Sequence, residues 1–344
     1  MGLVYLTAVT FFFSFGLYHK RIAFDLKALN ILIFTVVSVT AVVALQGLPD
    51  IGNYRKMYEG YALKGLVPGT DVGYVFLIKF FSFFGFDFFF FRTFTTVAFS
   101  LIYIRGILKC SSNLSLSLLI FFTTIFSISF LIQVRTGLGL AVIVGYGLPY
   151  YVKGKNFKFF LCVVAGSLFH VSLVTFIFPL VLAAVFKTPK AKAVIVIASL
   201  LILKLDVTTY LINMALAIAN LSYISKILAY INDSSGKEAF LSNRDFLALL
   251  IMFLTFRNTN SKMDNFMFWS YFSSFFLKLL FRNFGEIAFR FYLIFQYSFA
   301  FLMPLLYKKN NFIMRVFVVA LVLANFIMLI INYGSGSIFK SASF

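Results

Sequence analysis

Apolar runs follow one another along almost the entire chain of 344 residues, and no polar stretch between them is long enough to form a soluble domain. Hydrophobic residues make up 62% of the sequence and charged residues only 12%. A soluble fold could not cover so much apolar surface. The sequence therefore predicts one integral membrane domain that extends over residues 1–344.

About twelve of the runs have the character of membrane helices, which predicts an all-α, polytopic membrane protein with external loops. Several runs are shorter than the roughly 20 residues that cross a bilayer upright. A further run, Val72–Phe86, is interpreted as a re-entrant or interfacial helix, with a thirteenth span as the alternative. The twelve are Leu3–Tyr18, Leu29–Leu48, Phe88–Leu108, Asn113–Leu131, Val134–Val152, Phe157–Phe169, Val171–Phe186, Ala193–Leu205, Phe246–Phe256, Phe266–Phe281, Phe291–Tyr307 and Phe312–Tyr333.

The net charge of +19 comes from basic residues that gather in short loops between the runs. Such loops face the cytoplasm in membrane proteins and contact anionic lipid headgroups there. Nucleic-acid binding would need a soluble basic face, which this chain lacks. One path of the chain across the membrane, called the threading below, places every basic cluster on the cytoplasmic side. This threading requires that Val72–Phe86 does not cross the membrane and that the chain turns at His170. The loops left outside are 49–71, 132–135, the turn at 170, 206–243 and 282–290.

The longest of these external loops is predicted to contain an interfacial helix. Its first part, TTYLINMALAIANLSYISKILAYI, is apolar with a helical period, and the polar sequence NDSSGKEAFLSN follows it. A helix in the interface followed by a flexible loop fits this pattern better than a full span. The loop could act as a lid over a lipid-linked substrate. A helix that only rests on the membrane surface is an equally good interpretation.

Ionisable residues beside or within the apolar runs are the main candidates for function. An ionisable group at membrane depth costs about 2.5–3.5 kcal/mol on insertion scales and marks a functional site by default. The threading places all of the candidates on the external face. They are Asp50, Arg55, Asp71, Arg135, His170, Arg282, Glu286 and Arg290.

Two tyrosine-containing segments precede the run that begins at Phe88. Asp50, Tyr54 and Tyr58 are spaced four residues apart, so a short helix would place them on one face beside Arg55. This face could line a polar, sugar-sized site, because a phenol can stack on a sugar and donate a hydrogen bond. The alternative is a solvated loop with interfacial aromatic residues. In the second segment Asp71 precedes the run that contains Tyr74, where helix capping is a more common role than catalysis.

Arg135 opens an apolar run that is rich in glycine, and these glycines allow close packing of helix backbones. A guanidinium at a helix N-terminus is well suited to a diphosphate, because it offers two parallel donors and a permanent charge. The alternative is that Arg135 only reaches to lipid phosphates at the interface. We predict the diphosphate role.

His170 interrupts an apolar run and is one of two histidines in the chain. A neutral imidazole there could accept a proton, whereas a structural histidine at a helix break is the alternative. The sequence contains no Asp-x-Asp pair, no HExxH and no cluster of cysteine and histidine, so we predict no metal. It also lacks a Walker A motif and a dinucleotide-binding loop, so we predict no cofactor.

The order of these motifs along the chain resembles the EpsG family of Wzy-type polysaccharide polymerases. That family typically shows D-x3-Y, an acidic-x-G-Y element, I-R-Q-G-L-A and a small-residue run that ends in F-H-x-S. The resemblance covers residues 30–190. This chain matches the D-x3-Y motif with GLPD, which ends at Asp50, followed by Tyr54, and it matches the acidic-x-G-Y element from Asp71 to Tyr74. It matches the other two motifs with QVRTGLGLA around Arg135 and AGSLFHVSL around His170. Asp71 stands where glutamate is usual in the family. Thr136 stands where the I-R-Q-G-L-A motif has glutamine, so any role of that family glutamine has no counterpart at this position.

The resemblance implies a GT-C-like membrane glycosyltransferase at the outer face of the bacterial cytoplasmic membrane. Such an enzyme joins undecaprenyl-diphosphate-linked oligosaccharide repeat units during O-antigen, lipopolysaccharide or exopolysaccharide biosynthesis. It needs no metal and no cofactor. Its partners are lipid-linked oligosaccharides, membrane lipids and a chain-length regulator protein, but no nucleic acid.

The resemblance also implies roles for the candidate residues. Arg135 is expected to stabilise the departing lipid diphosphate, and His170 to act as the base for the acceptor hydroxyl, with Asp71 and Glu286 as rivals. Arg282 and Arg290 are candidates for a second phosphate contact. The residues expected to position sugars are Asp50, Tyr54, Arg55 and Tyr74.

Two other functions compete with the polymerase. A flippase for lipid-linked oligosaccharides should show paired halves or broken helices near the bilayer midplane, and the sequence shows no internal repeat. A glycan ligase would use the same donor and a different acceptor. The sequence does not separate a ligase from a polymerase.

Overall fold

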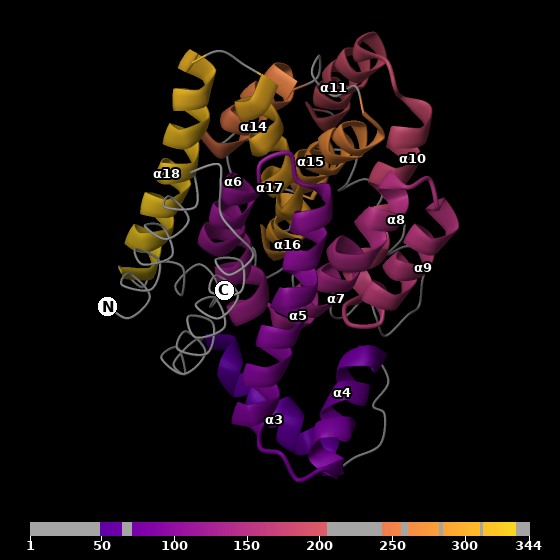
Figure 1. The fold of residues 1–344 in the computed structure, drawn as a ribbon, viewed down its shortest axis with the longest axis vertical. Helices are drawn as coiled ribbons and strands as arrows, with labels where there is room; N and C mark the ends of the chain where they lie inside the picture. The colour runs from indigo at the N-terminus through magenta and orange to yellow at the C-terminus, as the bar shows by residue number, and fades with distance from the viewer. Residues whose placement is uncertain are drawn as a thin grey trace, which may run out of the picture. The chain divides into compact units, whose positions relative to one another are not determined.

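The computed structural model describes residues 49–63, 71–204, 243–255, 261–281, 285–309 and 312–334. All regular secondary structure in these residues is helical (Figure 1). This confirms the all-α prediction for the described part of the chain. The chain divides into two compact units, one containing the residues up to Thr175 and from Met303, the other Phe176–Leu302. The prediction of a single integral membrane domain stays a prediction.

The first unit contains the helices that position the candidate site. Asp87 caps the start of the long helix α5 in this unit by accepting a hydrogen bond of 2.7 Å from the Phe90 N–H. Asn113 caps α6 in the same way through the Leu116 N–H. The helices of this unit are α3 (Pro49–Leu63), α4 (Val72–Phe83), α5 (Phe88–Cys110), α6 (Leu114–Ile120), η1 (Phe121–Ile132), α7 (Val134–Val142), η2 (Ile143–Gly147), α8 (Leu148–Val152), α9 (Asn156–Ser167) and α18 (Phe312–Gly334).

The sequence predicted most of these helix boundaries closely. The predicted runs Phe88–Leu108 and Val134–Val152 correspond to α5 and to the continuous segment formed by α7, η2 and α8. Of the described helices, two are long and apolar enough to cross a membrane, Phe88–Cys110 and Leu114–Ile132. The prediction of about twelve spans therefore stays a prediction.

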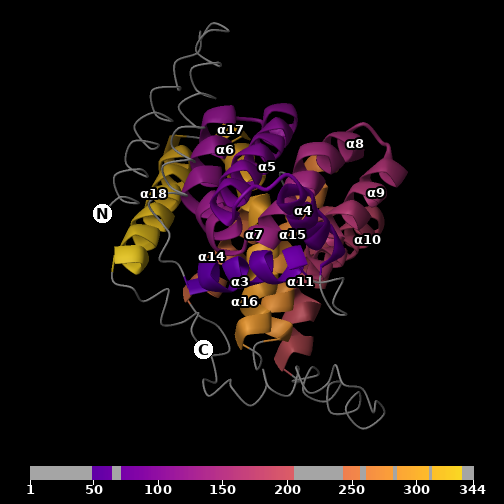
Figure 2. The ribbon, with the colours of Figure 1, turned by 90° about the horizontal axis from the view of Figure 1, so that it is seen from below.

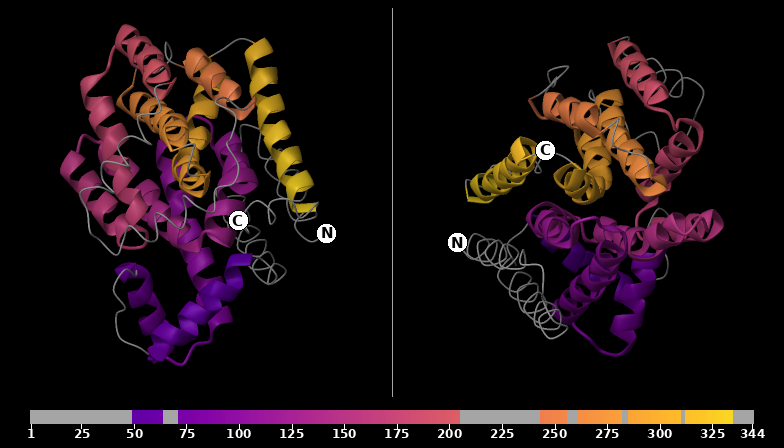
Figure 3. Two further views of the ribbon diagram at one scale, coloured as in Figure 1. Left: turned by 180° about the vertical axis from the view of Figure 1, so that it is seen from behind. Right: turned by 45° about the horizontal axis from the view of Figure 1, so that its top comes forward.

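The α3 and α4 helices lie side by side at one end of the first unit, next to the N-terminal part of α5 (Figures 1 and 2). Figure 3 shows the same pair from behind. Their contact consists of buried aromatic and aliphatic side chains that extend to the first turns of α7. The cluster comprises Tyr54, Tyr58, Tyr74, Ile78, Phe81, Phe91, Val134 and Leu138.

The second unit is built around α15, most of whose side chains are buried. Its Asn265 and Trp269 side chains donate hydrogen bonds of 2.9 Å to carbonyls at the end of α10, those of Ala183 and Phe186. Buried polar groups need such partners in an apolar environment. The unit contains α10 (Ile177–Val185), α11 (Pro189–Lys204), α14 (Asn243–Thr255), α15 (Lys262–Leu280), α16 (Gly285–Phe295) and η4 (Gln296–Ser298); η3 (Val171–Phe176) and α17 (Phe299–Lys309) cross the boundary between the units.

Glycines allow α5, α7, η2 and α9 to approach one another closely. A Cβ atom added to Gly106 would collide with the Val144 carbonyl, and one added to Gly145 would collide with the Ile102 carbonyl. Gly139 and Gly166 face each other in the same reciprocal way. The prediction that glycines permit close backbone packing in this region is therefore confirmed.

Replacement of Gly145 by alanine is expected to destabilise the protein by about 1–3 kcal/mol, because its added methyl group meets a backbone carbonyl that cannot rotate away. Thermal unfolding of the purified protein measures the effect. Gly60→Ala is the matched control, since nothing lies within 4 Å of a Cβ atom at that position. Equal unfolding temperatures for the two variants would contradict the close contact between α5 and η2.

Candidate functional site

Asp71, Arg135 and His170 meet in the first unit, although 64 residues separate the first two in the sequence. Asp71 immediately precedes α4, and Arg135 lies in the first turn of α7. His170 lies in the short connection between α9 and η3. The predicted interruption of the apolar run at His170 is confirmed, because α9 ends at Ser167 and η3 begins at Val171. Three residues that the sequence indicated independently as functional candidates thus form one cluster.

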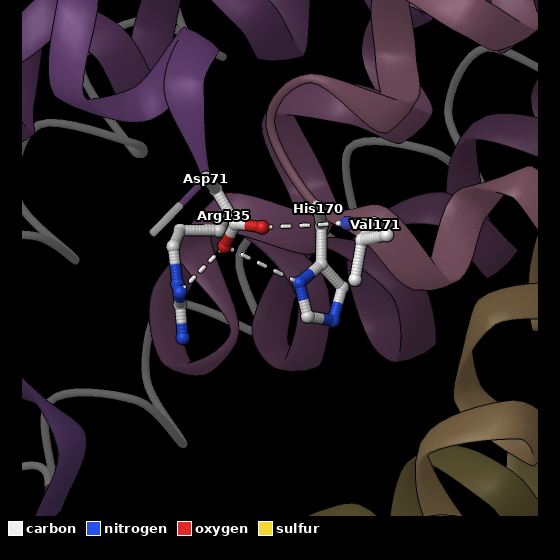
Figure 4. A network of polar contacts seen from close by, with 4 residues as sticks. All are labelled: Asp71, Arg135, His170 and Val171. Carbon is white, nitrogen blue, oxygen red and sulfur yellow. Dashed lines mark hydrogen bonds and ion pairs between the residues drawn. The ribbon is translucent and has the colours of Figure 1, made fainter. Parts of the chain in front are cut away.

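A single carboxylate oxygen faces both basic side chains (Figure 4). The Asp71 Oδ2 atom accepts a hydrogen bond from Arg135 Nη1 at 2.5 Å and lies 3.6 Å from His170 Nδ1. The longer distance exceeds that of a hydrogen bond. The other oxygen, Oδ1, accepts a hydrogen bond of 3.3 Å from the Val171 N–H. Asp71 does occupy the N-cap position of α4, but its side chain makes no capping hydrogen bond to that helix, so the prediction that its carboxylate caps α4 is wrong.

Backbone contacts fix the segments that carry these side chains. The Gly73 N–H donates a hydrogen bond of 2.8 Å to the Leu168 carbonyl, which joins the start of α4 to the connection that carries His170. A Cβ atom at Gly73 would lie 3.1 Å from that carbonyl, closer than most side chains tolerate. The D-x-G-Y sequence therefore places its carboxylate against His170 because its glycine allows the two backbones to approach.

The site is partly enclosed and holds Asp71 in its charged form. The side chains of Arg135, Asp71 and His170 are 28%, 10% and 14% exposed. Burial by itself raises the pKa of Asp71, but the facing His170 and Arg135 side chains and the Val171 N–H outweigh it and lower the pKa below its usual value. Asp71 is therefore a carboxylate at neutral pH. In that state it has no proton to donate and is engaged on both oxygens.

Two nitrogen atoms of the cluster, Arg135 Nε and His170 Nδ1, are buried without a hydrogen-bond partner. In Figure 4 the guanidinium and the imidazole flank the Asp71 carboxylate, and both extend to the same side of it. His170 Nε2 points away from Asp71 in this arrangement. The cluster can therefore offer a cation and a ring nitrogen to the same bound group.

Tyr54 and Tyr74 pack against each other beside the cluster. Their rings meet edge to face with centroids 5.9 Å apart, and the Arg135 guanidinium carbon lies 5.9 Å from the Tyr54 ring centroid. This geometry allows a cation–π interaction. Tyr74 is only 2% exposed and also packs against Phe91. In this structure the ring of Tyr74 packs between Tyr54 and Phe91, and a role in sugar contact stays a prediction.

Tyr58 and Arg55, both near the predicted tyrosine face, point elsewhere. The Tyr58 hydroxyl donates a hydrogen bond of 2.5 Å to the Phe86 carbonyl, which ties α3 to the turn between α4 and α5. Arg55 is largely exposed and forms an ion pair of 3.3 Å with Glu59, one turn along α3. An exposed pair of this kind contributes little to stability.

The other predicted residues are not brought into the cluster. Asp50 lies in the first turn of α3, and its side chain is outside the described residues. Arg282 is outside them too, as is the loop 206–243 with its predicted interfacial helix. Glu286 and Arg290 lie in α16 of the second unit; Arg290 is half-buried, and the side chain of Glu286 is not described. Their roles stay predictions.

One residue near the site was missed by the sequence reasoning. Arg92 is buried in α5 and interacts electrostatically with Tyr74. A charged residue inside the apolar run Phe88–Leu108 was the signal that could have identified it. Arg92 adds a second guanidinium to the surroundings of the cluster.

Among the residues that the structure describes, no group of three or more His, Cys, Asp or Glu side chains could hold a metal ion. The sequence model of a family described as "EpsG family" matches residues 29–341. No curated protein and no solved structure matches the chain. The family match confirms the resemblance that the motifs indicated, and extends it well beyond the residues that carry them.

Proposed function

The chain belongs to the EpsG family, a family of polysaccharide polymerases, and on this premise we propose that it joins undecaprenyl-diphosphate-linked oligosaccharide repeat units. Family membership and the apolar helices make it a membrane protein. We place the reaction at the outer face of the bacterial cytoplasmic membrane, because the threading by basic loops puts Asp71, Arg135 and His170 on that side. The reaction is proposed to need neither metal nor nucleotide.

The observation that carries this proposal is that the Asp71 carboxylate lies between a cation, Arg135, and a potential base, His170, in one partly enclosed cluster. Arg135 lies in the first turn of α7, where backbone N–H groups and the helix dipole also favour an anion. A guanidinium matches the geometry of a diphosphate better than an ammonium group does. Such a group can stabilise the charge that develops on a departing lipid diphosphate.

The proposed step is transfer of the growing glycan to a sugar hydroxyl of a new repeat unit. The bond between the anomeric carbon and the diphosphate oxygen breaks, and its electron pair leaves with the lipid diphosphate. The acceptor oxygen forms the new glycosidic bond to the same carbon. Its proton passes to His170 Nε2, the ring nitrogen that faces away from Asp71. Arg135 binds the diphosphate before and after the bond breaks.

The remaining predicted residues have supporting roles in this proposal. Tyr54 contacts the Arg135 guanidinium and Tyr74 packs against Tyr54, so both hold the cation in position. Asp50 and Arg55 would position sugars. Arg282 and Arg290 would supply a second phosphate contact, with Glu286 as a rival base.

Polymer formation by the purified protein tests the proposal. Synthetic undecaprenyl-diphosphate-linked repeat units are incubated with the protein in detergent, with a chelator and without nucleotide. A ladder of products that grows by one repeat unit at a time is expected. Conversion of the donor without any ladder would favour a ligase, and no conversion by folded protein would favour a transporter.

The topology is tested separately by thiol labelling of intact cells. In a variant with Cys110 and Cys162 replaced by serine, single cysteines at positions 52, 234 and 284 are expected to react with an impermeant reagent from outside. Cysteines at positions 23, 155 and 189 are expected to react only after the membrane is opened, because they lie near basic loops. Labelling of position 155 from outside would reject this threading.

A further inference from the structure

The Asp71 carboxylate makes a hydrogen bond with only one of its two basic neighbours. Its Oδ2 atom makes a short hydrogen bond with Arg135 Nη1, whereas His170 Nδ1 faces the same atom from 3.6 Å and has no hydrogen-bond partner. A buried donor or acceptor that lacks a partner costs free energy. The arrangement is therefore incomplete at His170 while Asp71 is held by Arg135.

Arg135 is also incompletely satisfied, because its Nε atom is buried without a hydrogen bond. A guanidinium binds a carboxylate or a phosphate best when two of its N–H groups donate in parallel to two oxygens. Asp71 uses only one of its oxygens for Arg135, because its other oxygen accepts from the Val171 N–H. A phosphate group has enough oxygens to engage both Nε and a terminal nitrogen of Arg135.

We propose that Asp71 occupies the place of a substrate phosphate oxygen on Arg135, and that a bound lipid diphosphate displaces it onto His170. The inference rests on the proposed function and makes Asp71 a positioning residue. Once displaced, the carboxylate accepts a hydrogen bond from His170 Nδ1–H. This tautomer leaves the lone pair of Nε2 free to accept the proton of the acceptor hydroxyl.

The required movement is small. A shift that shortens the contact between Oδ2 and Nδ1 from 3.6 Å to about 2.8 Å makes a hydrogen bond. The Asp71 side chain is not tied to α4 by a capping hydrogen bond, and its Oδ1 contact with the Val171 N–H is long at 3.3 Å. Rotation of the carboxylate about that contact leaves the backbone in place. Donor binding then orders the base, so the acceptor is activated only when a glycan is ready to be transferred.

Binding of inorganic pyrophosphate to the full-length protein in detergent tests the competition, because it does not depend on polymerase activity. Asp71→Asn is expected to bind pyrophosphate roughly tenfold more tightly than the unaltered protein in calorimetry. If the Asp71 carboxylate occupies the phosphate position on Arg135 about nine-tenths of the time, it weakens pyrophosphate binding about tenfold. Arg135→Gln is expected to lose this binding. Glu59→Gln is the matched control: it removes the same charge from an exposed ion pair on α3 and is expected to leave the affinity unchanged.

The state of the imidazole provides a readout that a merely structural aspartate would not change. A His19→Gln variant contains a single histidine, so ¹⁵N-histidine NMR reports on His170 alone. Pyrophosphate is expected to shift the Nδ1 resonance toward a protonated, hydrogen-bonded nitrogen, and Asp71→Asn is expected to prevent that shift. This experiment needs only the His19→Gln protein if the Asp71 variant does not fold.

The outcomes separate this inference from the proposed function. Arg135-dependent binding that is no tighter in Asp71→Asn, or an imidazole spectrum that pyrophosphate leaves unchanged, overturns the displacement of Asp71 and leaves the diphosphate site intact. Binding that survives in Arg135→Gln overturns the displacement together with the diphosphate site on Arg135. Tighter binding in Asp71→Asn with an unchanged Glu59→Gln control supports the displacement.

Discussion

Replacement of His170 by alanine is expected to lower the rate of polymer formation by about 10²–10⁴-fold, the usual contribution of a general base. The imidazole lies in the connection after α9 with Nδ1 toward Asp71 and Nε2 pointing away from it. Alanine removes the nitrogen that accepts the proton from the acceptor hydroxyl. The rate of ladder formation per amount of folded protein measures the loss.

His170→Gln distinguishes proton transfer from a structural role. The glutamine amide can donate a hydrogen bond to Asp71, but it cannot accept a proton at neutral pH. We therefore expect the glutamine variant to be as slow as the alanine variant while it unfolds at nearly the temperature of the unaltered protein. Recovery of the rate by glutamine would show that His170 is structural, and Glu286 would be the next residue to test.

Arg135→Lys is expected to lower the rate by about 10²–10³-fold, which is the usual cost of removing one donor that stabilises charge in a transition state. Lysine keeps the positive charge but loses the planar pair of N–H groups and the cation–π contact with Tyr54. Its ammonium can still pair with Asp71, so the fold of the cluster is retained. The loss is expected mainly in kcat, because the contact strengthens as the diphosphate departs.

Arg315→Lys on α18 is the control for this change, since its guanidinium is exposed and lies 5.6 Å from the Tyr307 ring. This variant is expected to form polymer at the normal rate and with normal chain lengths. A normal rate in Arg135→Lys as well would mean that charge alone is needed at position 135. In that case the bidentate contact with a diphosphate would be rejected.

The sequence allowed the residues of the cluster to be chosen but not their contacts. Asp71, Arg135 and His170 stand out because ionisable groups are rare and costly in apolar runs. Their meeting depends on backbone contacts between distant segments, such as that of Gly73 with Leu168, which no local pattern encodes. For the same reason the carboxylate of Asp71 looked like a helix cap, although its partners lie on other elements.

Burial of the tyrosines was also beyond the sequence pattern. Tyr54 and Tyr58 share a helix face, as their spacing predicted, but that face packs against α4 and α5. An amphipathic ring beside charged residues gives the same pattern whether it lies in a site or beneath one. The π-helical segments η1 and η2 had no recognisable signal, because they continue apolar runs without any change in composition.

The contact between Gly139 and Gly166 determines where the chain can change length. Gly139 lies four residues after Arg135, about one turn along α7, and Gly166 lies four residues before His170, in the last turn of α9. The segments from Arg135 to Gly139 and from Gly166 to His170 therefore form two short arms that start at the same contact. One residue inserted between Arg135 and Gly139 would rotate the Arg135 side chain by about 100° away from Asp71, because this arm is helical. One residue inserted between Gly166 and His170 would lengthen the connection that holds His170 near Asp71. An insertion in the turn at Gly154, which has a φ of 76° and open space around it, leaves both arms intact. Length variation should therefore accumulate in that turn and be excluded from the two four-residue arms.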